Sequence, residues 1–238
     1  MKFPLPAALL AAGLLLATGS ASAVPPETHA EARRAFLAAY ADAEAGRPLP
    51  EGEVLDVLGG YVLYPYLEAA QLRARLRAPG ADADAAARDF LARHGAEPYA
   101  RPVRRAWLDS LAARRRWADF LQVYATARTV DQTLRCQAIE ARVALGRVEG
   151  LREAVEAEWL TPRSAPVACD AGFDWLRSQG ALTPALVERR ARLALGAGET
   201  QLARWLARSL PEPAAQRVRD FATLLEKPAQ AIDAAIAS

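Results

Sequence analysis

The side chains that most often carry catalysis are few in this chain of 238 residues. His29 and His94 are its only histidines, and each stands where a capping or solvent-exposed role is more common than metal binding. Glutamates such as Glu140, Glu156 and Glu158 have the chemistry of a glycosidase pair, but their helical context favours solvent-exposed ion pairs with arginines. Nucleotide, zinc-protease and serine-hydrolase motifs are absent. We therefore predict no catalytic residue, no metal site and no cofactor.

Residues 1–23, MKFPLPAALLAAGLLLATGSASA, resemble an export signal. Lys2 supplies a positive start, residues 5–17 are apolar, and Ala21-Ser22-Ala23 matches a cleavage site. The apolar run is too short to span a bilayer, and no cysteine follows it that a lipid would modify. We predict cleavage after Ala23 and a mature chain of residues 24–238 in the periplasm, with no membrane span.

Cys136 and Cys169 are the only cysteines. An even cysteine count in an exported chain indicates a disulfide, which would restrict the unfolded chain by about 3–4 kcal/mol. The alternatives are two free thiols or a redox pair, although no C-x-x-C motif is present. We favour a structural disulfide.

The charge argues against a nucleic-acid partner, whereas the arginines and tryptophans leave an anionic or sugar ligand open. The formal net charge is +2, which gives no footprint for nucleic acid. The runs 104–105 and 114–116 are arginines that would suit an anionic ligand, but such runs are typical of the solvated face of a helix. The tryptophans would stack on sugars if exposed, yet their apolar helical context favours core packing for most of them. They are Trp107, Trp117, Trp159, Trp175 and Trp205.

Helical periodicity runs through the whole mature chain, and no sustained strand-like alternation is present. Two tyrosines flank Pro65, where Tyr64 and Tyr66 mark the start of a helix. Asp82 and Asp131 are expected N-caps. The expected helices cover 27–45, 65–77, 82–94, a stretch that starts at Pro102 and includes Leu111, 117–125, 131–146, 148–160, 168–178, 184–196, 200–210 and 214–226.

A short internal sequence repeat favours stacked helix pairs. "ARVALG" at 141–146 returns as "ARLALG" at 191–196, and a helix with a tryptophan follows each copy. The short loops predict antiparallel neighbours. The fold class is therefore all-α: an irregular α-solenoid or superhelix of about ten to twelve helices.

The ordered set "YVLYPYLEAAQL", "RRWADFL", "RCQAIEARVALG", "EAEWLTPRSAPVACDAGFDWL" and "VERRARLALGAGETQLARWLARSLP" resembles the N-terminal helical region of soluble lytic murein transglycosylases. The resemblance covers about residues 30 to 210. It implies a periplasmic superhelix joined to a lysozyme-like domain. That domain cleaves peptidoglycan glycan strands between N-acetylmuramic acid and N-acetylglucosamine, leaves a 1,6-anhydro product, and uses one glutamate without a cofactor.

The family's catalytic segments, E-S, G-L-M-Q and A-Y-N-A-G, do not occur in this sequence, because Met1 is its only methionine and it contains no asparagine and no Glu-Ser pair. We expect a helical scaffold of such an enzyme without the catalytic domain. The alternative is a stand-alone periplasmic solenoid that scaffolds cell-wall enzymes or binds peptidoglycan. The expected partners are peptidoglycan glycan strands and other cell-wall enzymes.

Overall fold

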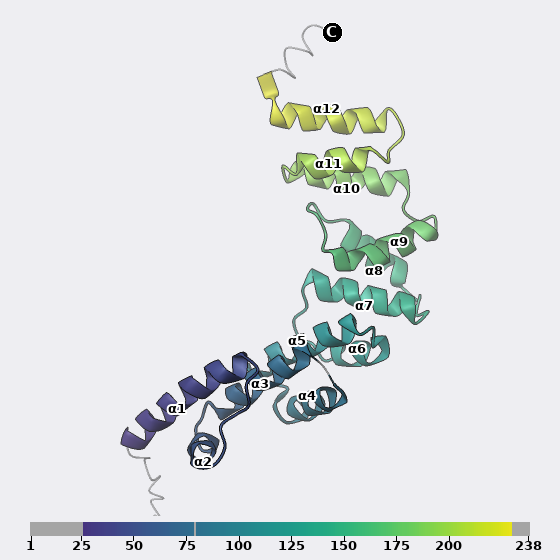
Figure 1. Cartoon of the computed structure of the whole chain (residues 1–238). Helices are drawn as coiled ribbons and strands as arrows, with labels where there is room; N and C mark the ends of the chain where they lie inside the picture. Colours follow the sequence, from purple (N-terminus) through teal and green to yellow (C-terminus); the bar gives the residue numbers. More distant parts are fainter. Residues whose placement is uncertain (1–25, 79, 230–238) are drawn as a thin grey trace, which may run out of the picture.

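The computed structural model describes residues 26–78 and 80–229 (Figure 1). The predicted signal peptide and the cleavage site after Ala23 lie outside these residues. Within them the chain forms twelve α-helices and no strand, which confirms the all-α fold class. The helices are α1 (Pro26–Glu44), α2 (Glu53–Gly59), α3 (Tyr64–Arg77), α4 (Ala81–His94), α5 (Ala100–Ala113), α6 (Trp117–Tyr124), α7 (Gln132–Ala144), α8 (Leu151–Trp159), α9 (Asp170–Ser178), α10 (Pro184–Gly196), α11 (Thr200–Ala207) and α12 (Ala214–Glu226), with a 3-10 helix η1 (Val167–Cys169) before α9.

The helices form an elongated, bent array. In Figure 1, α7 to α12 are stacked one above another, whereas α1, α3 and α5 run along a second direction, and the array turns near α5 and α6. Neighbours in sequence also pack together, as in the pairs α10 with α11 and α11 with α12. This nearest-neighbour packing is typical of a solenoid, in which each helix pair buries the face of the next.

The apolar core is divided into three clusters along the array. Leu58 belongs to the first cluster, between α1, α2 and α3, and Phe120 to the second, between α3 and α7. Leu206 belongs to the third, which extends from α7 to α12. All three side chains are almost fully buried, and each such burial contributes about 1.5–3 kcal/mol to folding. Because α7 contributes to the second and third clusters, it joins the two arms of the bend.

The helix ends follow the local chemistry of the sequence. The Asp131 carboxylate accepts a hydrogen bond from the Leu134 N–H at 2.9 Å, so it caps α7 as predicted. Asp82 does not cap α4; the N-cap is Gly80, and Asp82 lies in the first turn, where its charge favours the helix dipole. The chain leaves α7 through Gly146, whose φ of 66° is accessible to glycine at little cost.

One short helix was absent from the sequence prediction. α2 has only seven residues and starts at Glu53 after Gly52, without a side-chain cap. Its Leu58 fills the first core cluster. The helix therefore forms because α1 and α3 cover its apolar side, and not because of local propensity alone.

A disulfide and a close helix contact fix η1 and α9 against α7. The structure joins Cys136 to Cys169, whose Cα atoms are 4.7 Å apart. Gly172 lies so close to α7 that a Cβ atom there would approach the Ile139 Cγ2 to 2.7 Å. Glycine is thus required at this crossing for steric reasons.

Candidate functional site

The residues that suggested catalysis are dispersed over the fold. His29 is exposed on α1, whereas His94 lies at the end of α4, where its Nδ1 is 3.1 Å from the Tyr99 hydroxyl. Glu158 accepts from Arg135 at 2.5 Å, and Glu156 accepts from Arg152 at 2.8 Å. Over the described ranges, no three His, Cys, Asp or Glu side chains gather in an arrangement that would hold a metal ion.

The two tyrosines around Pro65 have packing roles. α3 begins at Tyr64, one residue before the predicted start at Pro65, and the Tyr64 ring packs against the first core cluster. Burial raises the pKa of its phenol above the ordinary value. Tyr66 is partly exposed and meets Tyr99, with ring centroids 4.9 Å apart.

Two arginines differ from the predicted solvated faces. Arg114 binds both carboxylate oxygens of Asp84, at 2.8 and 2.6 Å, and the same carboxylate accepts from Trp107 Nε1 at 2.9 Å. Arg104 is only 9% exposed. The solvated-face interpretation is wrong for these two positions because their side chains fold inward between helices.

The tryptophans divide by exposure. Trp107 and Trp159 are buried, Trp117 and Trp175 are half-buried, and Trp205 on α11 is 54% exposed. The core-packing prediction therefore holds for all but Trp205. Trp205 is thus the one tryptophan that presents more than half of its surface to solvent, and it lines a hollow.

Trp205 lies at the rim of a groove between α8 and α9 on one side and α10 and α11 on the other. The groove has a volume of about 610 Å³. A second hollow of about 450 Å³ shares three of its lining residues, Trp159, Arg177 and Trp205. We call this combined surface the Trp205 groove; its further aromatic and polar lining includes Phe173, Asp170, Asp174, Arg190 and Gln201.

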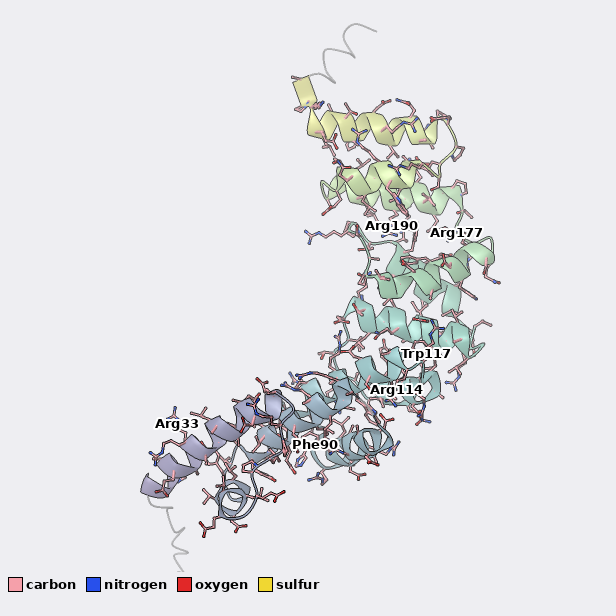
Figure 2. The ribbon with its side chains drawn as sticks, in the orientation of Figure 1. Arg33, Phe90, Arg114, Trp117, Arg177 and Arg190 are labelled. Atoms are coloured by element: carbon pink, nitrogen blue, oxygen red, sulfur yellow. A yellow bond between two sulfur atoms is a disulfide. The ribbon has the colours of Figure 1, made fainter. Side chains whose placement is uncertain are left out.

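The floor of the groove is an aromatic cage around a buried guanidinium. The Arg190 guanidinium carbon is 4.4 Å from the Trp159 ring centroid and 5.5 Å from that of Phe173. Its Nη2 donates to the Arg163 carbonyl at 3.3 Å, and its buried Nε has no acceptor. Figure 2 labels Arg190 and Arg177 in the part of the array between α9 and α10.

Burial sets the electrostatics of this floor. Arg190 is 3% exposed, and desolvation lowers the pKa of its guanidinium. Among the described residues, no carboxylate lies within ion-pair distance of it. The aromatic faces offset part of this cost through cation–π attraction. Asp174 at the rim is instead paired with Arg177.

This arrangement suits a ligand with apolar faces and polar edges, such as a sugar ring. Trp205 offers a flat apolar surface, while Gln201, Asp170 and Arg177 offer donors and acceptors around it. The exposure of Trp205 could have been predicted from the sequence. Ala203, Leu206 and residues 207 and 210 share one helical face, and Trp205 falls outside that face.

Known proteins match this chain over most of its length. No protein-family model matches it. A soluble lytic murein transglycosylase of Escherichia coli strain K12 is 30% identical over 204 residues, which are 85% of this chain and 31% of that protein. The enzyme of the same name from Salmonella typhimurium strain LT2 is 30% identical over 159 residues, 67% of this chain and 24% of that protein.

Solved structures agree. An inactive mutant of the lytic transglycosylase Slt from Pseudomonas aeruginosa superposes with a TM-score of 0.70 and 28% identity, covering 83% of this chain and 31% of Slt. The 70-kDa soluble lytic transglycosylase in complex with bulgecin A gives a TM-score of 0.66 and 25% identity. The chain is homologous to part of the soluble lytic murein transglycosylases.

The soluble lytic murein transglycosylases that it matches are much longer than this chain, which spans about 31% of the Escherichia coli relative. The shared part is helical, as its resemblance to this family implied. Within the residues that the structure describes, no helix combines the length and the apolar character that crossing a bilayer requires.

Proposed function

We propose that this chain is a helical scaffold of the kind found in lytic transglycosylases. In this proposal it acts in the periplasm and holds peptidoglycan glycan strands without cleaving them. The observation that carries the proposal is the Trp205 groove, found in a chain homologous to murein-cleaving enzymes.

The groove has the chemistry that such a role needs. N-acetylated sugars present one apolar face, which an exposed indole covers, and their hydroxyl and amide groups need donors and acceptors at the edges. Trp205 and Gln201 on α11 and Asp170 on α9 supply both kinds of contact. The openness of the surface to solvent favours a long polymer over a small enclosed molecule.

The test is co-sedimentation of the mature protein with isolated sacculi. We expect Trp205→Ala to weaken the binding severalfold, because stacking contacts of this kind contribute about 1–1.5 kcal/mol. The variant should keep its fold, since the ring is more than half exposed. Leu37→Ala is the control: Leu37 is 60% exposed on α1, outside the groove, so its loss should leave binding unchanged. Equal binding of all three proteins would contradict the proposal.

A further inference from the structure

A small pocket, separate from the Trp205 groove, lies between α5 and the connection from α6 to α7. It has a volume of about 40 Å³. Four arginines contribute to its lining: Arg101, Arg104, Arg105 and Arg128. We call it the arginine pocket. No acidic side chain is among the residues that line it.

Arg104 is the buried member of this group. Its Nη2 donates to the Gly95 carbonyl at 3.1 Å, whereas its buried Nε has no acceptor. The residue is 9% exposed, and burial together with the charge of Arg128 lowers the pKa of its guanidinium. A buried cation next to a second cation is costly for folding, and a bound anion would lower that cost.

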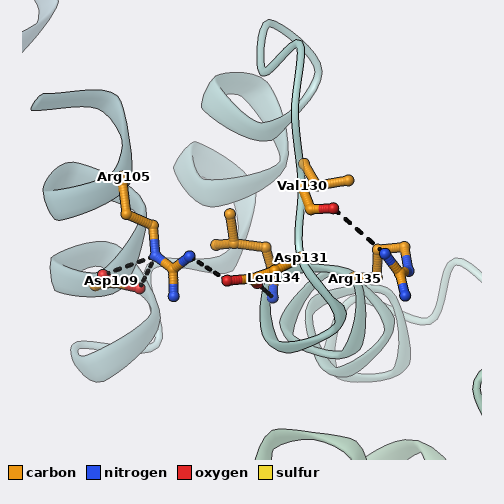
Figure 3. Close-up of polar contacts among 6 residues, drawn as sticks. All are labelled: Arg105, Asp109, Val130, Asp131, Leu134 and Arg135. Atoms are coloured by element: carbon orange, nitrogen blue, oxygen red, sulfur yellow. Dashed lines mark hydrogen bonds and ion pairs between the residues drawn. The ribbon is translucent and has the colours of Figure 1, made fainter. Parts of the chain in front are cut away.

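Arg105, which also lines the pocket, already has two acidic partners. Its Nε donates to both oxygens of Asp109 at 3.0 Å, and its Nη1 donates to Asp131 at 2.5 Å (Figure 3). Asp131 also caps α7 through Leu134. These contacts raise the pKa of Arg105 and tie α5 to α7. The Arg105 charge is thereby balanced, while Arg104 has no ion pair within the described residues.

We infer that the arginine pocket binds a single carboxylate group of an acidic peptide. Arg104 contributes to the pocket lining a guanidinium without an ion pair in the described part of the chain, and Arg101 and Arg128 add exposed positive charge. Arginine donors match the two oxygens of a carboxylate. The volume holds about one such group, since a water molecule takes about 30 Å³ of liquid. Resting on the proposed function, the carrier is the peptide stem of peptidoglycan.

Isothermal titration of the mature protein tests this with four probes: a soluble, sugar-free stem peptide with free carboxylates, the same peptide with those groups amidated, acetate, and inorganic phosphate. We expect the free acid to bind at least about tenfold more tightly than its amide, with an affinity that falls as salt rises. Equal affinity for the free acid and the amide would overturn the inference. Phosphate binding as tightly as the free acid would overturn the assignment to carboxylate.

Arg104→Met keeps an apolar stem of similar length and removes the guanidinium. It should lose the preference for the free acid, and its melting temperature should not fall, because an uncompensated buried charge is removed. If the Arg104→Met variant does not fold, Arg128→Gln tests the inference instead, because Arg128 is exposed. We expect this variant to bind the free acid severalfold more weakly. Arg152→Met is the control, since Arg152 is exposed on α8 and paired with Glu156. An unchanged preference in both pocket variants would contradict the inference.

The two proposals fail separately. Trp205→Ala should leave binding of the short stem compound to the arginine pocket unchanged. If sacculus binding depends on Trp205 but the amidated and free compounds bind alike, only the pocket inference falls. If the free acid binds through Arg104 but sacculi are not retained, the glycan-holding function falls and the carboxylate site stands.

Discussion

Asp84 holds α4 and α5 together through one carboxylate. It is 9% exposed, and its partners are the Trp107 indole N–H and both terminal nitrogens of Arg114. The hydrogen bonds from Arg114 lower the pKa of the Asp84 carboxyl, although burial acts in the opposite direction. The ionised form is thus more stable in the folded chain than in the unfolded one.

Replacement of this residue should therefore have an effect that depends on pH. We expect Asp84→Asn to cost about 2–3 kcal/mol in the free energy of unfolding at pH 7, because Arg114 is left partly buried without its acid. Since the folded pKa is depressed, the stabilisation is present above the ordinary value of 3.8 and is lost as pH falls through the lower folded value. Urea unfolding at a series of pH values measures the difference between the two proteins, which should shrink in acid.

The control for this pair is Asp174→Asn. Asp174 also pairs with an arginine, Arg177, but its side chain is 70% exposed. Exposed ion pairs contribute little, so we expect a change below about 0.5 kcal/mol at neutral pH. A similar loss in both variants would show that the buried geometry of Asp84 is not what stabilises the fold.

The sequence did not reveal which arginine side chains are buried. Adjacent arginines predict a solvated helix face, which agrees with Arg115 and Arg116 but not with Arg114 or Arg104. The partner of Arg114 is thirty residues away in sequence, on a different helix. Side-chain burial of this kind depends on how two helices cross, and one-dimensional spacing carries no information about that crossing.

At the level of the elements, the link between α7 and η1 is the clearest constraint. Cys136 and Cys169 are separated by 33 residues, and both are 1% exposed. A disulfide here restricts the unfolded chain, so we expect replacement of both cysteines by alanine to cost about 3–4 kcal/mol. Thermal unfolding of the two proteins measures the loss. Alkylation of the unreduced, denatured protein followed by mass spectrometry should find no reactive thiol, and two labelled cysteines would contradict the bond.

Most helices were predictable because each has its own apolar stripe and its own stop signal. The bounds expected for residues 184–196 and 214–226 match α10 and α12. α2 was missed because seven residues give too little periodicity to detect, although Glu53 and Asp56 place acidic residues in its first turn. The bend near α5 and α6 was also beyond prediction, since it results from crossing angles between neighbours.

For the molecule as a whole, the proposed periplasmic site of action requires export. Residues 1–23 carry the positive, apolar and small-residue parts of a signal peptide. We expect the protein from a periplasmic fraction to begin at Val24, as measured by mass spectrometry of the intact chain and its N-terminal peptide. A chain that keeps Met1 and stays in the cytosol would contradict both the compartment and the oxidising environment that the disulfide needs.

The protonation of the carboxyl groups bears on whether the chain can cleave its proposed ligand. Cleavage of a glycosidic bond needs a carboxylic acid that stays protonated near neutral pH beside the bound sugar. In the described chain, the acids whose pKa values depart from the ordinary range all depart downwards: Asp84, Asp131, Glu188, Glu212 and Glu226. In the Trp205 groove, Asp174 is paired with Arg177. At the five positions with lowered pKa values the ionised form is favoured, which suits ion pairs better than proton donation.

The mature protein should therefore release no 1,6-anhydro muropeptides from isolated sacculi, although it binds them. Chromatography with mass spectrometry of the soluble fraction measures this, and sacculi digested with a muramidase show that release would be detected. The decisive contrary result would be anhydro products that disappear in Asp170→Asn or Glu158→Gln. Asp170 is the groove carboxylate nearest in sequence to the disulfide, and Glu158 is held by Arg135 on the adjoining helix. Persistence of binding without release in the wild-type protein and both variants is the pattern that a strand-holding scaffold requires.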